Sequence, residues 1–442
     1  MRKHHNARKM IKIKSTVLSI FFKTIWILLV LLIGLIVLVL YDFKITSVND
    51  FQRNIEIAYI RNFGEYFIHS KEQRKLNDWF HIIDHYYVYS AYWEYRKQPT
   101  CVRIIAIGPT KEINPYTFFC LLKYGNGSIN VSYVTYKMLP ENHGRPHVPF
   151  FFYCETSEVP VEVALVHYKQ NTTHWIKVGL TEPEDNDKNW RNNIVVCVKP
   201  TFGEFPNNNL RIAEFVAYYQ LMGAQHIAFY DYKANKSVKL LINALIDAGA
   251  PISLFPWTFP RDINDAWDKA HMANVADCMY RYARTHQYVV TVDIDEFIVP
   301  KQNISLLKII NEHKFPWGTL MFLNAFFSLD IPDDPETANE TIPLLTLKKT
   351  AYVQLWPAYK RSKCIIVPTK VEIPGIHYTW SAMKGWGTIV VNPNYAKVHH
   401  YRKLNTKFKT FSRDQTAWRY SNSILKSDEI KVWNRLFVKK IS

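Results

Sequence analysis

The sequence predicts an α/β fold: a parallel β-sheet covered by helices on both faces, preceded by a β-rich lobe and by one transmembrane helix. Three observations predict it. After residue 190, short apolar runs alternate with amphipathic helical patterns, residues 96–180 contain strand-like runs bounded by turn residues, and residues 25–41 are apolar and uncharged. A chain of 442 residues, 48% of them hydrophobic, can bury one large core or two ordinary ones.

Residues 25–41 are expected to span a membrane as an uncleaved signal anchor. As a helix the run is about 26 Å long, close to the hydrocarbon thickness of a thin bilayer. Residues 1–24 carry seven Lys and Arg residues and no acidic residue, and no small-residue cleavage pattern follows the run. The basic tail is expected to be cytoplasmic, which predicts a single-pass type II protein with its folded part in the lumen.

Charge and cysteine usage indicate in which compartment the folded part lies and which partners it can bind. The net charge is +17, and the part beyond the basic tail suits either an anionic substrate or a solvated basic surface. Nucleic acid is disfavoured because the anchor places the chain in a lumen. All six cysteines follow the anchor and allow up to three disulfides, and none forms the CxxC pairs of a zinc site. Glycosylation sequons also follow the anchor, at Asn126, Asn130, Asn171, Asn235, Asn303 and Asn339.

The chain is expected to divide into a short stem and two folded regions. Residues 42–95 read as a stem that merges into folded structure, and 96–190 as the β-rich lobe. Residues 191–402 form the α/β region, and 403–442 a C-terminal extension. The polar segment 181–193 is the best candidate for the boundary between the lobe and the α/β region.

Within the α/β region, strands and helices alternate. Each expected strand is a continuous apolar run, which is typical of a parallel sheet with both faces buried. Ser237 is expected to cap the second helix, and Gly223 and Gly249 to end the first and second. The expected strands cover 193–200, 226–232, 251–257 and 288–295, and the expected helices cover 207–223, 237–249 and about 265–284.

The fourth of these strands ends in the acidic sequence VVTVDIDEFIVP, residues 289–300. Asp293 and Asp295 are two residues apart and so address the same side of the strand end, where their charges repel unless a cation lies between them. Oxygen ligands in a half-open site suit Mn²⁺ or Mg²⁺, which keep positions free for the phosphates of a nucleotide diphosphate. A bare D-x-D arises by chance about once in a chain of this size, so a capping or salt-bridge role is the alternative.

Four segments, in order, make the sequence resemble a known family. They are NNNLRIAEFVAYYQLMGAQHIAFYDY, ANVADCMYRYARTHQYVVTVDIDEFIVP, RSKCIIVPTKVEIPGIHY and KVHHYR, and together they are similar to the family 92 glycosyltransferases over about residues 190–402. The resemblance implies a GT-A-type, Rossmann-like nucleotide-sugar fold in a type II Golgi membrane enzyme. It also implies β-galactosyl transfer from UDP-galactose to a glycan acceptor, such as fucose or galactose of N-glycans.

The resemblance also implies roles for individual residues. Asp293 and Asp295 would hold Mn²⁺ and the UDP, with His400 of the H-Y-R motif as third metal ligand and His399 as its rival. Arg361 and Lys363 of the RSK motif would neutralise diphosphate charge. Arg402 is expected to bind substrate, and Glu296 either orients the site or caps the turn.

If transfer inverts the anomeric centre, a carboxylate must accept the proton of the acceptor hydroxyl. The acidic loop SLDIPDDPE offers Asp330 as the candidate base. Trp257, Trp317, Trp380 and Trp386 are candidates for stacking on sugars, although most buried tryptophans are core residues. Two other classes stay open. An inactive, lectin-like luminal protein would keep the sheet without the metal ligands, and a metal-dependent hydrolase would need a denser cluster of ligands than the sequence offers.

Overall fold

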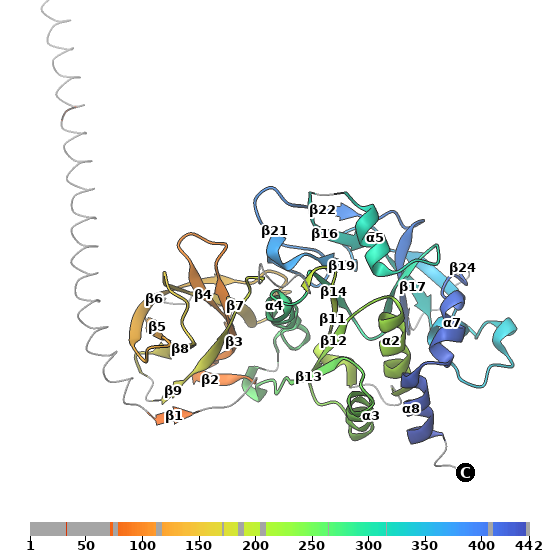
Figure 1. Cartoon of the computed structure of the whole chain (residues 1–442), viewed down its shortest axis with the longest axis horizontal. Helices are drawn as coiled ribbons and strands as arrows, with labels where there is room; N and C mark the ends of the chain where they lie inside the picture. The colour runs from red at the N-terminus through yellow and green to blue at the C-terminus, as the bar shows by residue number, and fades with distance from the viewer. Residues whose placement is uncertain are drawn as a thin grey trace, which may run out of the picture. The chain divides into compact units, whose positions relative to one another are not determined.

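The computed structural model describes most of the chain after residue 70 (Figure 1). The described residues are 32, 71–73, 78–111, 117–169, 172–183, 190–203, 209–263, 265–314, 316–404 and 410–438. The elements named below all belong to one compact unit, His69–Ser442. The predicted anchor at 25–41 lies, apart from Leu32, outside the described residues. Among those residues, no helix is both long and apolar enough to cross a bilayer.

The N-terminal lobe is an eight-stranded sheet in which seven strands close into a β-barrel and β2 extends from β3, which confirms the β-rich lobe predicted from the sequence. Its strands lie in the order β10-β8-β5-β6-β7-β4-β3-β2, and a parallel pairing between β10 and β3 closes the ring. The strands are β2 (Phe80–Ile83), β3 (Tyr86–Glu94), β4 (Cys101–Pro109), β5 (Phe118–Lys123), β6 (Ile129–Met138), β7 (His147–Glu155), β8 (Glu162–His167) and β10 (Ile176–Gly179). Separately, β1 (Lys71–Gln73) pairs with β9 (Thr172–His174). The lobe thus includes residues 80–94, which the sequence analysis placed in the stem.

Strand β4 has two buried faces. Val102, Ile104 and Ala106 face the barrel interior, whereas Ile105 and Ile107 belong to a second hydrophobic cluster that also contains residues of the α/β domain. This division follows from the two-residue repeat of a strand. The barrel and the α/β domain therefore share a core.

The α/β domain is built on a seven-stranded sheet with the order β13-β12-β11-β14-β19-β16-β22. The first four of these strands are parallel, as predicted, and β19 runs antiparallel to both of its neighbours. The order of the parallel strands reverses between β11 and β14, which is the topological switch point of the sheet. Ligands of such sheets bind at the carboxyl ends of the strands at this point. The strands are β11 (Ile194–Val198), β12 (His226–Asp231), β13 (Ile252–Pro256), β14 (Tyr288–Val292), β16 (Trp317–Phe322), β19 (Lys363–Ile366) and β22 (Gly387–Val390).

Helices cover the sheet on both faces (Figure 1). Val196 of β11 packs with the cluster that contains α2 and α3, and Val195 packs with α4 and the barrel on the other face. The C-terminal helices also pack in the first cluster, through Tyr420, Ile424 and Ile430, so the expected extension 403–442 is part of the domain core. The helices are α2 (Asn209–Leu221), α3 (Lys236–Asp247), α4 (His271–Tyr282), α5 (Leu306–Glu312), α6 (Leu345–Lys348), α7 (Trp418–Leu425) and α8 (Asp428–Phe437).

A five-stranded sheet with the order β15-β23-β17-β18-β24 completes the domain. Its first strand, β15, begins at Glu296, the last residue of the acidic turn Asp293–Glu296. In the pairing of β15 with β23, Glu296 lies opposite His400. This register places a residue from late in the chain beside the acidic turn. The strands are β15 (Glu296–Pro300), β23 (Ala396–Arg402), β17 (Asn324–Ser328), β18 (Ala351–Leu355) and β24 (Ser412–Arg413); β20 (Val371–Ile373) and β21 (Ser381–Ala382) form a separate pair.

Two helix predictions need correction. The third helix of the α/β region begins at His271, not near 265, because Asp268, Lys269 and Ala270 have positive φ angles of 48°, 55° and 59°. Left-handed residues cannot continue a right-handed helix. The cap of α3 is Asn235 rather than Ser237: its side chain accepts from the Val238 N–H, and the Ser237 hydroxyl donates to it.

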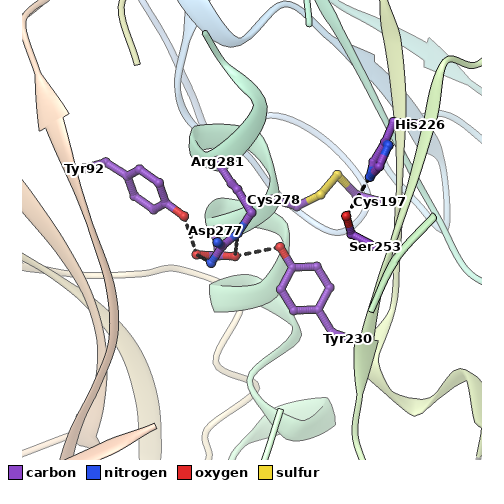
Figure 2. Close-up of a disulfide and its surroundings, with 8 residues drawn as sticks. All are labelled: Tyr92, Cys197, His226, Tyr230, Ser253, Asp277, Cys278 and Arg281. Atoms are coloured by element: carbon purple, nitrogen blue, oxygen red, sulfur yellow. Dashed lines mark hydrogen bonds and ion pairs between the residues drawn. A yellow bond between two sulfur atoms is a disulfide. The ribbon is translucent and has the colours of Figure 1, made fainter. Parts of the chain in front are cut away.

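Two disulfides form among the described residues, one fewer than six cysteines allow. Cys120–Cys154 joins two barrel strands, and Cys197–Cys278 joins β11 to α4 (Figure 2). The second crosslink fixes α4 against the sheet next to the candidate site. The other cysteines, Cys101 and Cys364, are buried free thiols.

Asp277 on α4 links the barrel to the sheet (Figure 2). Its buried carboxylate accepts hydrogen bonds of 2.6 Å from Tyr92 of the barrel and 2.6 Å from Tyr230 of β12, and it pairs with Arg281 at 3.0 Å. Burying a carboxylate is favourable only when such partners are in place. The contact is therefore a fixed point between the two parts of the molecule.

We expect Asp277→Asn to lower the free energy of unfolding by about 1–3 kcal/mol, because the half-buried Arg281 and two buried tyrosine hydroxyls lose their charged acceptor. Thermal unfolding of the detergent-solubilised chain measures the change. Asp428→Asn is the control: it removes only an exposed ion pair with Lys431, which is worth about 0–1 kcal/mol. Equal stability of the two variants would contradict the role of Asp277.

Candidate active site

A polar cavity of about 490 Å³ lies at the carboxyl ends of β11 and β14. Lys199 and Thr201 reach it from the segment after β11, and Asp293 and Glu296 reach it from the acidic turn after β14. This is where a sheet of this winding binds ligands. The complete lining is Arg145, Lys199, Thr201, Asp265, Ala266, Trp267, Asp268, Lys269, His271, Asp293, Glu296, Arg361, Ile376, His377, His400 and Arg402.

The cation that neutralises the acidic turn is Lys363. Its Nζ lies 2.9 Å from Asp293 Oδ1 and 3.0 Å from Glu296 Oε2. Lys363 and Glu296 are each 1% exposed, so the ammonium is enclosed with the carboxylates. Burial alone would lower the pKa of Lys363, but Asp293 and Glu296 outweigh it and raise that pKa. Conversely, Lys363 and Lys199 overcome burial and hold the pKa of Asp293 well below its usual range.

His400 completes the other side of the turn. Its Nε2 lies 3.4 Å from Asp295 Oδ2, and its Nδ1 lies 3.1 Å from Glu296 Oε1, which also accepts from the Asn324 amide at 3.0 Å. The rival His399 points away from the site, because neighbouring residues of β23 face opposite sides. Its ring stacks on Phe327 with a centroid distance of 4.2 Å.

Asp295 and His400 fit a divalent metal ion. Asp295 Oδ2 and His400 Nε2 face each other and would hold one ion between them, and Glu296 contacts the other nitrogen of the histidine ring, which fixes the orientation of the ring. In the part of the chain that the structure describes, no group of three or more His, Cys, Asp or Glu side chains is arranged to hold a metal. The predicted set of three ligands is thus not assembled, because Asp293 pairs with Lys363. Two protein ligands suffice where substrate phosphates complete the shell, as is common for Mg²⁺.

Two arginines, Arg361 and Arg402, lie beside the acidic turn, and neither is paired with a carboxylate of the described residues. Arg361 and Arg402 both pack over the ring of Phe326, with guanidinium-to-centroid distances of 5.5 Å and 5.2 Å. Among the described residues, neither forms an ion pair, and Arg402 Nε is buried with no hydrogen-bond partner. Burial and then the nearby Arg402 lower the pKa of Arg361. Two like charges held together without a counter-ion form a site for an anion.

Comparison with known proteins identifies the family. Residues 192–435, which include the acidic turn, Lys363, Arg361 and the His400 strand, match the model of glycosyltransferase family 92. The chain belongs to glycosyltransferase family 92. The barrel lies outside the matched residues. No curated protein matches the sequence.

Three solved structures resemble this family 92 chain distantly. The apo structure of the bifunctional glycosyltransferase WbbM is 10% identical over 34% of this chain and 27% of that protein, with a TM-score of 0.20. A UDP-glucose pyrophosphorylase from Acinetobacter baumanii is 10% identical over 57% of this chain and 99% of its own, with a TM-score of 0.24. A 4-diphosphocytidyl-2C-methyl-D-erythritol synthase from Anaerococcus prevotii has a TM-score of 0.22 at 11% identity, over 53% and 97%.

Other expected residues of the family 92 domain lie away from the cavity. Asp330 is exposed and accepts from the Leu404 N–H at 2.7 Å, so the structure does not bring the predicted base to the cavity. Trp257 and Trp317 are fully buried core residues, and Trp380 and Trp386 are not in the cavity lining either.

Several residues that line the cavity were missed from the sequence. Lys199 and His271 both approach Asp268 Oδ2, at 2.8 Å and 3.3 Å, and Trp267 lines the wall next to them. The rule that ligands bind after parallel strands points to Lys199, which directly follows the first strand. For the segment 265–271, the helical prediction hid the signal, because it placed these residues inside a helix.

Proposed function

We propose that this family 92 glycosyltransferase moves a hexose, most simply galactose from UDP-galactose, onto a glycan acceptor with inversion. The observation that carries the proposal is the pair Arg361 and Arg402, two guanidiniums without carboxylate partners beside a carboxylate turn. A nucleotide diphosphate supplies the anion that such a pair binds. The donor sugar and the inversion come from the family resemblance and stand as part of the proposal.

The residues in and around the acidic turn have distinct roles in this proposal. Arg361 and Arg402 bind the diphosphate and stabilise the charge that grows on it as the sugar departs. Lys363 holds Asp293 and Glu296 in place, and Glu296 in turn orients His400. Asp295 and His400 would hold Mn²⁺ or Mg²⁺, which when bound supplies further positive charge to the leaving diphosphate. The proposal includes a GT-A-type fold, and the parallel strands β11–β14 support that part of it.

We further propose that the enzyme resides in the Golgi membrane, anchored by residues 25–41 with its folded part in the lumen. The disulfides Cys120–Cys154 and Cys197–Cys278 support an oxidising compartment.

Incubation of the detergent-solubilised chain with UDP-hexoses tests this function. We expect release of UDP and transfer of the hexose to glycan acceptors, with loss of both after chelation of divalent ions. Arg361→Ala and Arg402→Ala should each weaken UDP binding by about tenfold or more, as expected for a charge-assisted contact. Lys360→Ala, an exposed neighbour of Arg361, is the control. Binding of glycans without any turnover of UDP-sugars would instead indicate a lectin.

A further inference from the structure

The barrel contributes a wall to the cavity, although it lies outside the residues that match the family. The contribution comes from the barrel hairpin, which we define as residues 139–147, the connection from β6 to β7 together with the first residue of β7. Arg145 of this hairpin lines the cavity. On one side the hairpin is fixed by Glu141, whose Oε2 accepts from the Trp380 indole at 3.2 Å and from the Ile376 N–H at 3.3 Å.

On its other side the barrel hairpin contacts the segment that precedes α4. The His143 ring lies against Trp267 with a centroid distance of 3.9 Å, and the Arg145 guanidinium lies 5.7 Å from the same ring. His147 Nδ1 lies 2.7 Å from Asp265 Oδ1. The hairpin therefore contacts two separate parts of the α/β domain. Arg145 lies over Trp267 and lines the same cavity as Asp265.

Both facing segments are held in uncommon backbone conformations. In the hairpin, Glu141 and His143 have φ angles of 64° and 52°, and Asp268, Lys269 and Ala270 across from it are also left-handed. Residues other than glycine persist in this conformation only where the surroundings fix them, and they cluster at functional sites. The Arg145 backbone is fixed by a hydrogen bond, which its carbonyl accepts from the Thr110 hydroxyl at 2.6 Å.

These residues form the mouth of the cavity rather than its floor. Arg145 is exposed, Trp267 is half-buried and the Asp265 side chain is 43% exposed, whereas Lys363 and Glu296 at the acidic turn are enclosed. In the proposed function the phosphates of the donor bind Arg361 and Arg402, so the donor lies at the end of the cavity beside the acidic turn. A glycan that stays attached to a carrier must enter from the solvent side and meets the mouth first.

We propose that Arg145, Asp265 and Trp267 form the subsite for the acceptor sugar, with the barrel hairpin determining which sugar it takes. The chemistry suits a neutral hexose or deoxyhexose ring. An aromatic side chain packs against the apolar face of a sugar. A carboxylate accepts hydrogen bonds from the sugar hydroxyls, and a guanidinium donates hydrogen bonds to them. The assignment rests on the proposed function, because it presupposes a donor at the acidic turn.

Arg145→Ala tests the subsite in the full chain, with methyl β-galactoside and methyl α-fucoside as acceptor probes and UDP-galactose as donor. We expect the KM for the preferred glycoside to rise by at least about tenfold, from loss of a charge-assisted hydrogen bond, while the donor KM changes by less than about twofold. Arg145→Lys should restore part of the loss. Lys177→Ala, an exposed barrel lysine that does not line the cavity, should leave both constants unchanged. An unchanged acceptor KM, or a raised donor KM instead, would overturn the proposal.

Saturation-transfer NMR with the same glycosides separates this inference from the proposed function. If wild-type protein binds a glycoside and Arg145→Ala does not, the sugar subsite stands even if no UDP-hexose is turned over. If UDP-hexose is turned over and Arg145→Ala binds the glycoside as wild type does, the transferase stands and the subsite is wrong.

Discussion

Replacing Asp295 with asparagine should reduce hexose transfer by at least about 100-fold, because the change removes one of two side chains suited to hold the divalent ion at the leaving diphosphate. The fold should survive. The only side-chain partner of the Asp295 carboxylate among the described residues is His400 at 3.4 Å, and the amide has the same shape. Initial rates with UDP-galactose and a glycan acceptor, at the lowest Mn²⁺ concentration that saturates the wild type, measure the loss.

Asp247→Asn is the matched control for this experiment. Asp247 is exposed at the end of α3 and does not line the cavity, so transfer should stay at the wild-type rate. Raising the Mn²⁺ concentration should restore part of the activity of Asp295→Asn if the loss lies in metal affinity. Full activity of Asp295→Asn at low Mn²⁺ would rule out the metal role of the acidic turn.

The largest effect on stability is expected from Lys363→Met. The substitution leaves Asp293 and Glu296 without their cation in an enclosed site, and breaking a buried ion pair from one side costs about 3–5 kcal/mol. We expect the free energy of unfolding of the detergent-solubilised chain to fall by that amount, measured by urea denaturation. Donor binding should be lost as well, since Glu296 orients His400.

A second substitution distinguishes charge from packing. Adding Glu296→Gln to Lys363→Met removes one of the two unpaired carboxylates, so the double variant should regain part of the stability. Lys360→Met, three residues earlier on the surface, serves as the control and should change little. If Lys363→Met unfolds within about 1 kcal/mol of wild type, the ion pairs are not what stabilises the turn.

The shared core and the Asp277 contact argue that the barrel is part of the catalytic unit. A buried charge also lies at the contact between the barrel and the α/β domain. Arg103 of the barrel is fully buried, pairs with Glu94 at 2.9 Å and lies 4.5 Å from the ring of Tyr280 on α4. Breaking such contacts leaves charges without partners in a low-dielectric interior. The barrel is therefore suited to hold the barrel hairpin rigidly at the mouth of the cavity.

The local pattern of the sequence predicted much of this protein. Continuous apolar runs indicated the parallel strands, since both faces of such strands are buried, and the run ending at Asp293 and Asp295 marked the site at a carboxyl end. The resemblance of ordered segments to family 92 pointed to His400, Arg361, Lys363 and Arg402, all of which the structure places at or beside the cavity.

Only the tertiary structure decided which of these residues are partners. Lys363 neutralises Asp293 from 70 positions away through the pairing of β14 with β19, and His147 reaches Asp265 across 118 positions. Periodicity reports which face of an element is buried but not what packs against it, so neither contact is visible in the sequence. For the same reason the sequence predicted a helix over 265–270, where Asp268, Lys269 and Ala270 are left-handed and Lys199 and His271 pair with Asp268 instead.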